Sequence, residues 1–237
     1  MRSQSHAFSK LKESREVAPG SIAGLIDHTL LSPVATYGEI KTLCEEALRY
    51  GFFSVCVNPF FIKAAKDILK DSSVKVTTVI GFPLGMTLTE VKVYEAMTAL
   101  LLGADELDIV INLGALKSGD WSVVRKDISD VISATGGHIH KAIIETCYLT
   151  DEEKRIAVDV ALNAGSEFIK TSSGFGPKGA TVKDIRLIRE IIGEKAGIKA
   201  AGGIRTLKRL LTMIKAGAAR IGTSSGARIM KELECKD

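Results

Sequence analysis

Eight short runs of apolar and β-branched residues alternate with longer segments of helical period along almost the whole chain. The runs lie at residues 22–27, 53–57, 74–80, 106–111, 138–144, 167–170, 197–201 and 220–223. The segments between them place apolar residues three and four positions apart, which is the pattern of one buried helical face. This alternation predicts parallel strands joined by crossover helices.

Glycine marks the points where the expected helices end. Gly51, Gly103, Gly165 and Gly217 each follow a helical segment and come shortly before the next run. Glycine adopts the left-handed conformation of a helix C-cap without the steric cost of a Cβ atom. Repeats of about 25 to 30 residues without a linker favour one α/β domain, a single (β/α)8 TIM barrel. A doubly wound open sheet is the alternative that the alternation leaves open.

The length of 237 residues is close to the roughly 250 residues that such a barrel needs. Because 46% of the residues are hydrophobic and 25% are charged, the composition is that of a soluble globular protein. We expect residues 1–20 to form a short N-terminal helical extension and residues 21–237 to form the catalytic barrel. Residues 1–20 mix basic, acidic and polar side chains, unlike a secretory signal.

Charge and cysteine usage limit the expected partners and location. The 32 Lys and Arg exceed the 28 Asp and Glu by a net charge of +4, and the basic residues are not interleaved with aromatic ones. We therefore expect no nucleic-acid partner. No apolar stretch is long enough to span a membrane, so we expect no membrane association. Four cysteines without a CxxC motif favour a cytoplasmic location.

Four charged residues stand in or beside the apolar runs: Asp27, Asp108, Lys170 and Lys199. The active site of a TIM barrel lies at the C-terminal ends of its strands, so we interpret these residues as strand-end site residues. Lys170 and Lys199 hold matching positions on runs that would be neighbouring strands, about 4.8 Å apart. A like charge and a dry environment lower a lysine pKa, which makes an amine able to form a Schiff base. Outward-facing lysines are the alternative.

Asp108 shares one face of its run with Val110 and Asn112. A carboxylate in so apolar a strand needs a cationic partner, and inward-facing lysines would supply one. We interpret Asp108 as a proton-transfer group, although a purely structural ion pair fits the run equally well. The same two interpretations apply to Asp27.

Loops rich in Gly, Ser and Thr follow the last three runs, at residues 171–176, 202–203 and 222–226. Glycine lets backbone N–H groups close on an anion, and TIM barrels often bind phosphate after strands 7 and 8. We therefore predict a phosphate site there, with ordinary tight turns as the alternative.

Two other kinds of site find little support. Residues 174–179 match the GxGxxG pattern of dinucleotide-binding proteins, but the match comes late in the chain and no acidic residue ends a following strand. The four histidines, His6, His28, His138 and His140, lack the clustering of a metal site. We expect no metal and no cofactor.

Six segments, in order over nearly the whole chain, resemble the deoxyribose-phosphate aldolase family: residues 26–31, 104–112, 141–146, 168–174, 199–205 and 222–225. The resemblance implies a metal-free class I aldolase that acts through a lysine Schiff base. Such an enzyme reversibly splits 2-deoxy-D-ribose 5-phosphate into D-glyceraldehyde 3-phosphate and acetaldehyde, in deoxyribose phosphate catabolism. It also implies a homodimer or a higher homo-oligomer.

By position, the resemblance implies that Lys170 forms the Schiff base, Lys199 is the neighbouring cation, and Asp108 moves protons with Lys199 and a water. The implied substrate site comprises Asp27, Cys56, Lys141 and Thr171. The implied phosphate site comprises Gly174, Gly202, Gly203, Gly222, Ser224 and Ser225. Two positions depart from some members of the family: Phe175 replaces a lysine that would contact phosphate, and Ala200 replaces a proline.

Two alternatives remain at this level. The chain could be another Schiff-base aldolase or a transaldolase that acts on a different phosphorylated sugar. It could also be a barrel that binds sugar phosphates without catalysis.

Overall fold

Eight parallel strands close into one barrel in a computed structural model that describes residues 22–235. Each strand pairs with the next, and β8 pairs with β1. The strands are β1 (Ile26–Leu30), β2 (Ser54–Val57), β3 (Lys75–Ile80), β4 (Glu106–Val110), β5 (Ile139–Ile143), β6 (Phe168–Lys170), β7 (Gly197–Ala201) and β8 (Arg220–Thr223). The closed order confirms the predicted TIM barrel and excludes the open sheet. The extension expected at residues 1–20 lies outside the described residues.

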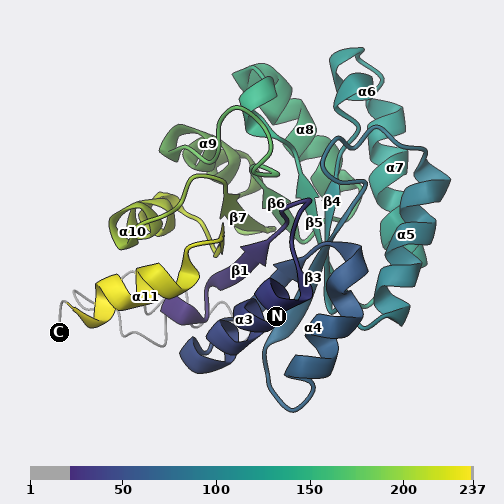
Figure 1. The fold of residues 1–237 in the computed structure, drawn as a ribbon. Coiled ribbons are helices and arrows are strands. Elements are labelled where there is room, and N and C mark those ends of the chain that lie inside the picture. The colour runs from purple at the N-terminus through teal and green to yellow at the C-terminus, as the bar shows by residue number, and fades with distance from the viewer. Residues whose placement is uncertain (1–21, 236–237) are drawn as a thin grey trace.

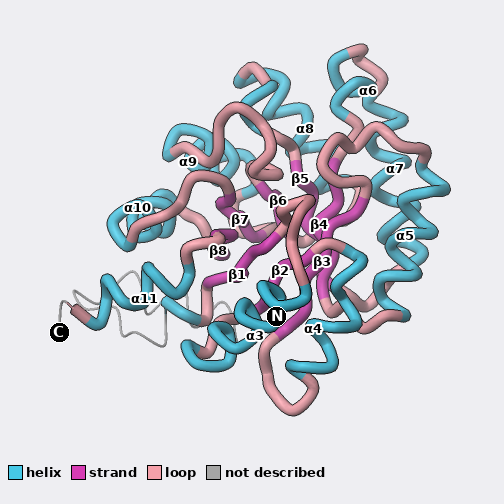
Figure 2. Tube along the Cα trace, viewed as in Figure 1, coloured by secondary structure: helices cyan, strands magenta, loops and turns pink. Residues whose placement is uncertain are grey.

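Helices surround the barrel and connect its strands (Figure 1). They are α3 (Tyr37–Tyr50), α4 (Ile62–Leu69), α5 (Thr89–Leu101), α6 (Leu113–Lys117), α7 (Trp121–Ala134), α8 (Asp151–Asn163), α9 (Val182–Ile192), α10 (Leu207–Ala216) and α11 (Gly226–Glu234), with short 3-10 helices η1 (Pro59–Phe61) and η2 (Thr146–Tyr148). Figure 2 shows the strands enclosed by helices, with loops joining the two layers. Among the described residues, no helix is long and apolar enough to cross a membrane.

The glycines expected at helix ends adopt the left-handed backbone conformation. Gly51, Gly103, Gly165 and Gly217 have φ values of 69°, 104°, 100° and 118°. Glycine is favoured in this region because a Cβ atom would be strained there. Each turn therefore returns the chain from a helix to the next strand, as predicted.

The first strand begins later than the sequence pattern predicts. The run at 22–27 was expected to be the strand, but Ile22 and Ala23 are helical and the amide of Leu25 donates to the carbonyl of Ile22 at 3.0 Å. The strand instead includes His28, a polar residue that the apolar pattern did not favour. His28 is buried against the ring of Phe52 and contacts Glu46 at 2.6 Å, which explains how a polar side chain fits inside the fold.

Candidate active site

Two lysines and one aspartate meet inside the barrel, near the carboxyl ends of the strands. Lys170 on β6 is paired in register with Lys199 on β7. Their ammonium groups both contact Oδ2 of Asp108 on β4, at 2.8 Å and 2.6 Å respectively. The predicted inward orientation of both lysines is therefore confirmed, and Asp108 joins them directly.

A third lysine holds the other oxygen of this carboxylate. The Nζ atom of Lys141 on β5 lies 2.8 Å from Oδ1 of Asp108 and 2.7 Å from Oε2 of Glu106. Asp108 thus accepts from three ammonium groups that come from three neighbouring strands. All three lysine side chains are almost completely buried.

Asp27 and Arg220 extend the cluster toward the closing edge of the barrel, where β1 meets β8. Asp27 contacts Lys199 at 2.5 Å through one oxygen and Arg220 at 2.7 Å through the other. Arg220 also contacts Glu106 at 3.3 Å, and its guanidinium carbon lies 3.3 Å from the centre of the Phe53 ring. These contacts fix Asp27 beside Lys199.

Ion pairs shift the pKa values of the central groups more strongly than burial does. Burial alone would raise the pKa of Asp108, but three lysines hold it well below its usual value. Burial would also raise the pKa of Asp27, but Arg220 and two lysines lower it. Burial would lower the pKa of Lys199, but Asp108 and Asp27 raise it above its usual value. Both aspartates are therefore ionised and Lys199 is protonated at neutral pH.

The sequence pattern predicted that four charged residues lie at strand ends, but only one of them does. Lys170 is the last residue of β6, but Asp27, Asp108 and Lys199 lie inside their strands. Lys170 and Lys199 are in register, and with Lys141, Arg220 and the carboxylates they form one charged layer inside the barrel. Among the lysines of this layer, only Lys170 lines the adjacent cavity.

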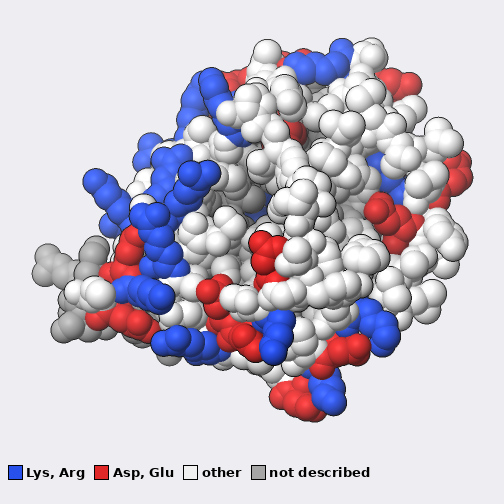
Figure 3. Space-filling view, in the orientation of Figure 1, with Lys and Arg blue, Asp and Glu red and all other residues white. Residues whose placement is uncertain are grey.

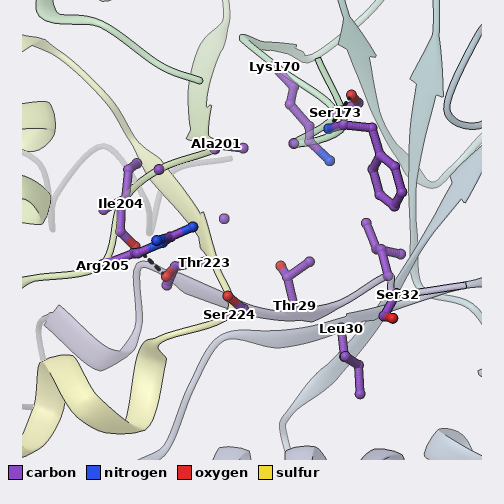
Figure 4. A pocket seen from close by; sticks show the side chains of 16 residues that line it. Thr29, Leu30, Ser32, Lys170, Ser173, Ala201, Ile204, Arg205, Thr223 and Ser224 are labelled. Carbon is purple, nitrogen blue, oxygen red and sulfur yellow. Dashed lines mark hydrogen bonds between the residues drawn. The ribbon is translucent and has the colours of Figure 1, made fainter. Parts of the chain in front are cut away.

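A cavity of about 360 Å³ opens above this layer. Lys170 reaches into it from β6, with Arg205, Thr223 and Ser224 on the opposite side (Figure 4). The predicted site residues that line the cavity are Lys170, Gly174, Gly202, Gly203, Gly222 and Ser224. Its volume is within the usual range for small-molecule sites.

Three glycines of the cavity lining have a positive φ. Gly174, Gly202 and Gly203 have φ values of 93°, 85° and 73°. Their N–H groups have no acceptor among residues 22–235. Donors of this kind can hold an anion such as phosphate.

Several predicted residues lie outside the cavity wall. Thr171 is buried, and its hydroxyl accepts from the amide of Ala201 at 3.1 Å. Ser225 donates its amide to the hydroxyl of Thr223 at 2.9 Å. Cys56 is buried below the cavity, where burial raises the pKa of its thiol. Their predicted contacts with a substrate remain predictions.

Several residues of the site were not predicted from the sequence. Among them, Glu106 and Arg220 complete the charged layer, and Arg205 and Thr29 line the cavity. Arg205, Thr29 and Glu106 fall within the segments used for the resemblance, which could have pointed to them. Arg220 begins its strand, where no local pattern tells which face a charged side chain takes.

Phe175 makes one wall of the cavity apolar. Its ring packs edge-to-face on Phe82 with the centroids 5.2 Å apart, and the side chain is half-exposed. This phenylalanine therefore supplies no charge to an anion. No three His, Cys, Asp or Glu side chains within the described part of the chain are grouped to hold a metal ion.

Comparison with known proteins decides the family. Residues 21–232 match the family described as "DeoC/LacD family aldolase". This chain belongs to that family. A curated relative, the deoxyribose-phosphate aldolase of Thermococcus gammatolerans, is 58% identical over 214 residues, which cover 89% of this chain and 95% of the relative. The lysines inside the barrel are thus those of an aldolase.

Two solved structures resemble this aldolase over nearly its whole length. A putative deoxyribose-phosphate aldolase from Coccidioides immitis has a TM-score of 0.90 at 36% identity, covering 98% of this chain and 97% of that one. The deoxyribose phosphate aldolase of Aeropyrum pernix, described as a tetramer, has a TM-score of 0.87 at 32% identity. That match covers 100% of this aldolase and 99% of the other chain.

Proposed function

We propose that this aldolase reversibly splits 2-deoxy-D-ribose 5-phosphate into D-glyceraldehyde 3-phosphate and acetaldehyde, with Lys170 as the Schiff-base lysine. The position of Lys170 carries the proposal. Of the three lysines that contact Asp108, it alone borders the cavity, so a substrate carbonyl can reach its amine. The names of the curated relatives support the same reaction.

The ion pairs distinguish Lys170 from the other cations of the charged layer. The charged layer holds four cations, Lys141, Lys170, Lys199 and Arg220, against three carboxylates. Lys141 and Lys199 each contact two of these carboxylates. Lys170 contacts one, through an oxygen that it shares with Lys199. Among these three lysines, Lys170 therefore has the fewest carboxylate contacts, and its side chain lines the cavity.

The reaction then follows from the reactivity of an amine. The Lys170 amine attacks C1 of the open-chain sugar and water leaves, which gives a protonated imine. When the C3 hydroxyl loses its proton, the C2–C3 bond breaks and its electrons move to the imine as an enamine. Protonation of C2 and hydrolysis then release acetaldehyde and the free lysine. Asp108, held by its lysines, would transfer these protons.

The glycine loops would hold the phosphate group. Gly174, Gly202 and Gly203, whose amides have no acceptor among residues 22–235, line the cavity together with the cation Arg205. Basic side chains also gather over α9 and α10, beside these loops (Figure 3). Exposed cations here include Lys178, Arg186 and Lys208. A positive surface around the entrance would attract an anionic sugar phosphate.

Trapping the intermediate tests the Schiff base. Acetaldehyde and borohydride should add a two-carbon group to Lys170, located by mass spectrometry, and Lys170→Ala should abolish both the adduct and turnover. A missing adduct on Lys170 would sink the mechanism. Cleavage of 2-deoxy-D-ribose 5-phosphate, compared with other phosphorylated sugars, tests the substrate separately.

We also propose that the aldolase self-associates through α5. Its outward positions Val91, Tyr94, Met97 and Leu101 are 48%, 74%, 47% and 87% exposed, so an apolar stripe faces outward. Such a stripe on an outer helix is typical of a protein interface. The tetrameric Aeropyrum pernix relative supports a second copy as the partner.

Light scattering tests this interface. The variant Tyr94→Glu/Leu101→Glu should have a smaller molar mass than the wild type, because buried charges would oppose association. Leu48→Glu, a change at an exposed leucine of α3, is the control and should leave the mass unchanged. A monomeric wild type would contradict the proposal.

The location proposed for the aldolase is the cytoplasm. All four cysteines are unpaired, two of them buried, which suits a reducing compartment.

A further inference from the structure

Glu145 has a backbone conformation that is rare for its residue type. It lies two residues after the end of β5 and has φ 47° and ψ 67°, the only positive φ among the described residues that are not glycine. A side chain with a Cβ atom is strained in this left-handed region. Strain of this kind persists only where surrounding contacts enforce it, and it often occurs at functional sites.

The strained residue is a bulge between β5 and β6. The amide of Ile144 donates to the carbonyl of Lys170 at 3.0 Å, and the amide of Thr146 donates to the carbonyl of Thr171 at 2.9 Å. The chain therefore advances two residues on the β5 side and one on the β6 side. Glu145 is the extra residue, and it stands beside the end of the strand that carries Lys170.

The Glu145 carboxylate packs against the turn formed by residues 173–176. One oxygen accepts from the amide of Ser173 at 3.0 Å. The other lies so close to Gly176 that an added Cβ would be 3.2 Å from it and 2.7 Å from Sγ of Cys147. The carboxylate thus lies against both ends of the turn. A side chain at position 176 would press against Cys147 and Glu145.

The side chain of Glu145 is buried although it carries a carboxyl group. Glu145 is 2% exposed, and no Lys, Arg or His of residues 22–235 forms an ion pair with it. A buried carboxyl group is costly unless it is hydrogen-bonded, and Glu145 accepts from the amide of Ser173 and, at 3.8 Å, from the thiol of Cys147. Both the strained backbone and the buried carboxyl group are therefore associated with this one turn.

The apex of the turn belongs to the cavity. Gly174 and Phe175 form the apex and line the cavity with Lys170. The amide of Ser173 is taken by Glu145, and the amide of Phe175 donates to the hydroxyl of Ser173 at 3.0 Å. The amide of Gly174 has no acceptor among residues 22–235, and Gly174 itself lines the cavity.

We propose that Glu145 is a positioning residue that holds the 173–176 turn so that the Gly174 amide is available to the substrate phosphate. This inference rests on the proposed function, because it assigns the turn to a phosphorylated substrate. Glu145 does not touch the reacting carbon atoms. Its removal should therefore weaken binding of the phosphorylated substrate while the Lys170 chemistry survives.

A pair of variants separates the carboxylate from the backbone. Glu145→Gly removes the acceptor and also relieves the left-handed strain, so the protein should stay folded. It should raise KM for 2-deoxy-D-ribose 5-phosphate roughly tenfold or more and change kcat less. Glu145→Gln keeps an oxygen acceptor for the Ser173 amide and should restore KM to within about threefold of the wild type. Acetaldehyde trapping on Lys170 should persist in both variants.

Hydrogen exchange gives a readout that does not depend on the substrate. The Ser173 amide should exchange faster in Glu145→Gly than in the wild type and should be protected again in Glu145→Gln. An unchanged KM and unchanged Ser173 exchange in Glu145→Gly would overturn the proposal, as would a Gln variant as impaired as the Gly variant. If the wild type does not cleave the sugar phosphate but traps acetaldehyde, the substrate assignment fails and exchange still tests the turn.

Discussion

Lys170 and Lys199 occupy paired positions on β6 and β7, and both ammonium groups contact the same oxygen of Asp108. Lys199 also contacts Asp27, so it is held by two carboxylates while Lys170 shares one. Two residues of the same type therefore differ in the number of carboxylates that they contact. The two carboxylates raise the pKa of Lys199, which keeps its charge, whereas Lys170 lines the cavity and is the proposed Schiff-base lysine.

Replacing Lys199 tests this division. In Lys199→Leu, Asp27 and Asp108 would each lose a cationic contact, and Asp108 would no longer be held by Lys199. We expect kcat for 2-deoxy-D-ribose 5-phosphate to fall by about 100-fold or more. Steady-state kinetics measure the loss. Lys117→Leu, which breaks an exposed pair with Glu153, is the control. An unchanged kcat in Lys199→Leu would contradict the role.

The lysine pair could be predicted from the sequence because it depends on local features. Lys170 and Lys199 each end or interrupt a short apolar run, and consecutive runs become neighbouring strands in an α/β barrel. Alternation along a strand then places both side chains on the same face. The sequence contains all three facts within about 30 residues, which is one repeat of the barrel.

The contact between Arg220 and Asp27 could not be predicted in this way. Arg220 contacts Asp27 across 193 residues of sequence, and this contact exists only because β8 closes on β1. Nothing in the run at 220–223 indicates that its first residue points inward. The late start of β1 has a similar cause, since His28 is accommodated by Glu46 and Phe52 from other elements.

The stability of the protein should depend on pH through Asp27. Its pKa is lowered in the folded state because Arg220 and two lysines outweigh burial. Its stabilising contribution is therefore present above the unfolded pKa of about 4 and decreases as the pH falls below that value. Asp27→Asn should have a lower Tm than the wild type at pH 7, with a gap that narrows below about pH 4. Calorimetry checks this, with Asp67→Asn as a surface control. A constant gap would refute the linkage.

Gly179 allows the loop after β6 to contact the loop after β7. A Cβ at Gly179 would lie 2.2 Å from the carbonyl oxygen of Gly202, so the two backbones touch. Gly179→Ala must push the loops apart and displace the glycine amides. We expect KM for the sugar phosphate to rise roughly tenfold or more, with less effect on unphosphorylated deoxyribose. Gly136→Ala has room for its Cβ and is the control. Equal losses for both substrates would argue against a phosphate site here.

Lys92 and Asp127 form a buried ion pair outside the active site. Lys92 on α5 contacts Asp127 on α7 and donates to the carbonyl of Val110 at 2.8 Å, at the end of β4. Burial lowers the pKa of Lys92 and raises the pKa of Asp127, in each case against the attraction of the partner. The pair thus joins two outer helices to the strand that carries Asp108, at a substantial cost of desolvation.

The two halves of this pair should depend strongly on each other. Lys92→Met leaves the buried Asp127 carboxylate without its cation, which should lower the free energy of unfolding by about 3–5 kcal/mol. The double variant Lys92→Met/Asp127→Leu removes both charges and should recover most of that loss, because well-packed apolar side chains can replace a buried ion pair. Urea denaturation of the wild type, both single variants and the double variant measures the coupling. If the loss in free energy of unfolding of the double variant equals the sum of the two single losses, the two charges do not stabilise the fold as a pair.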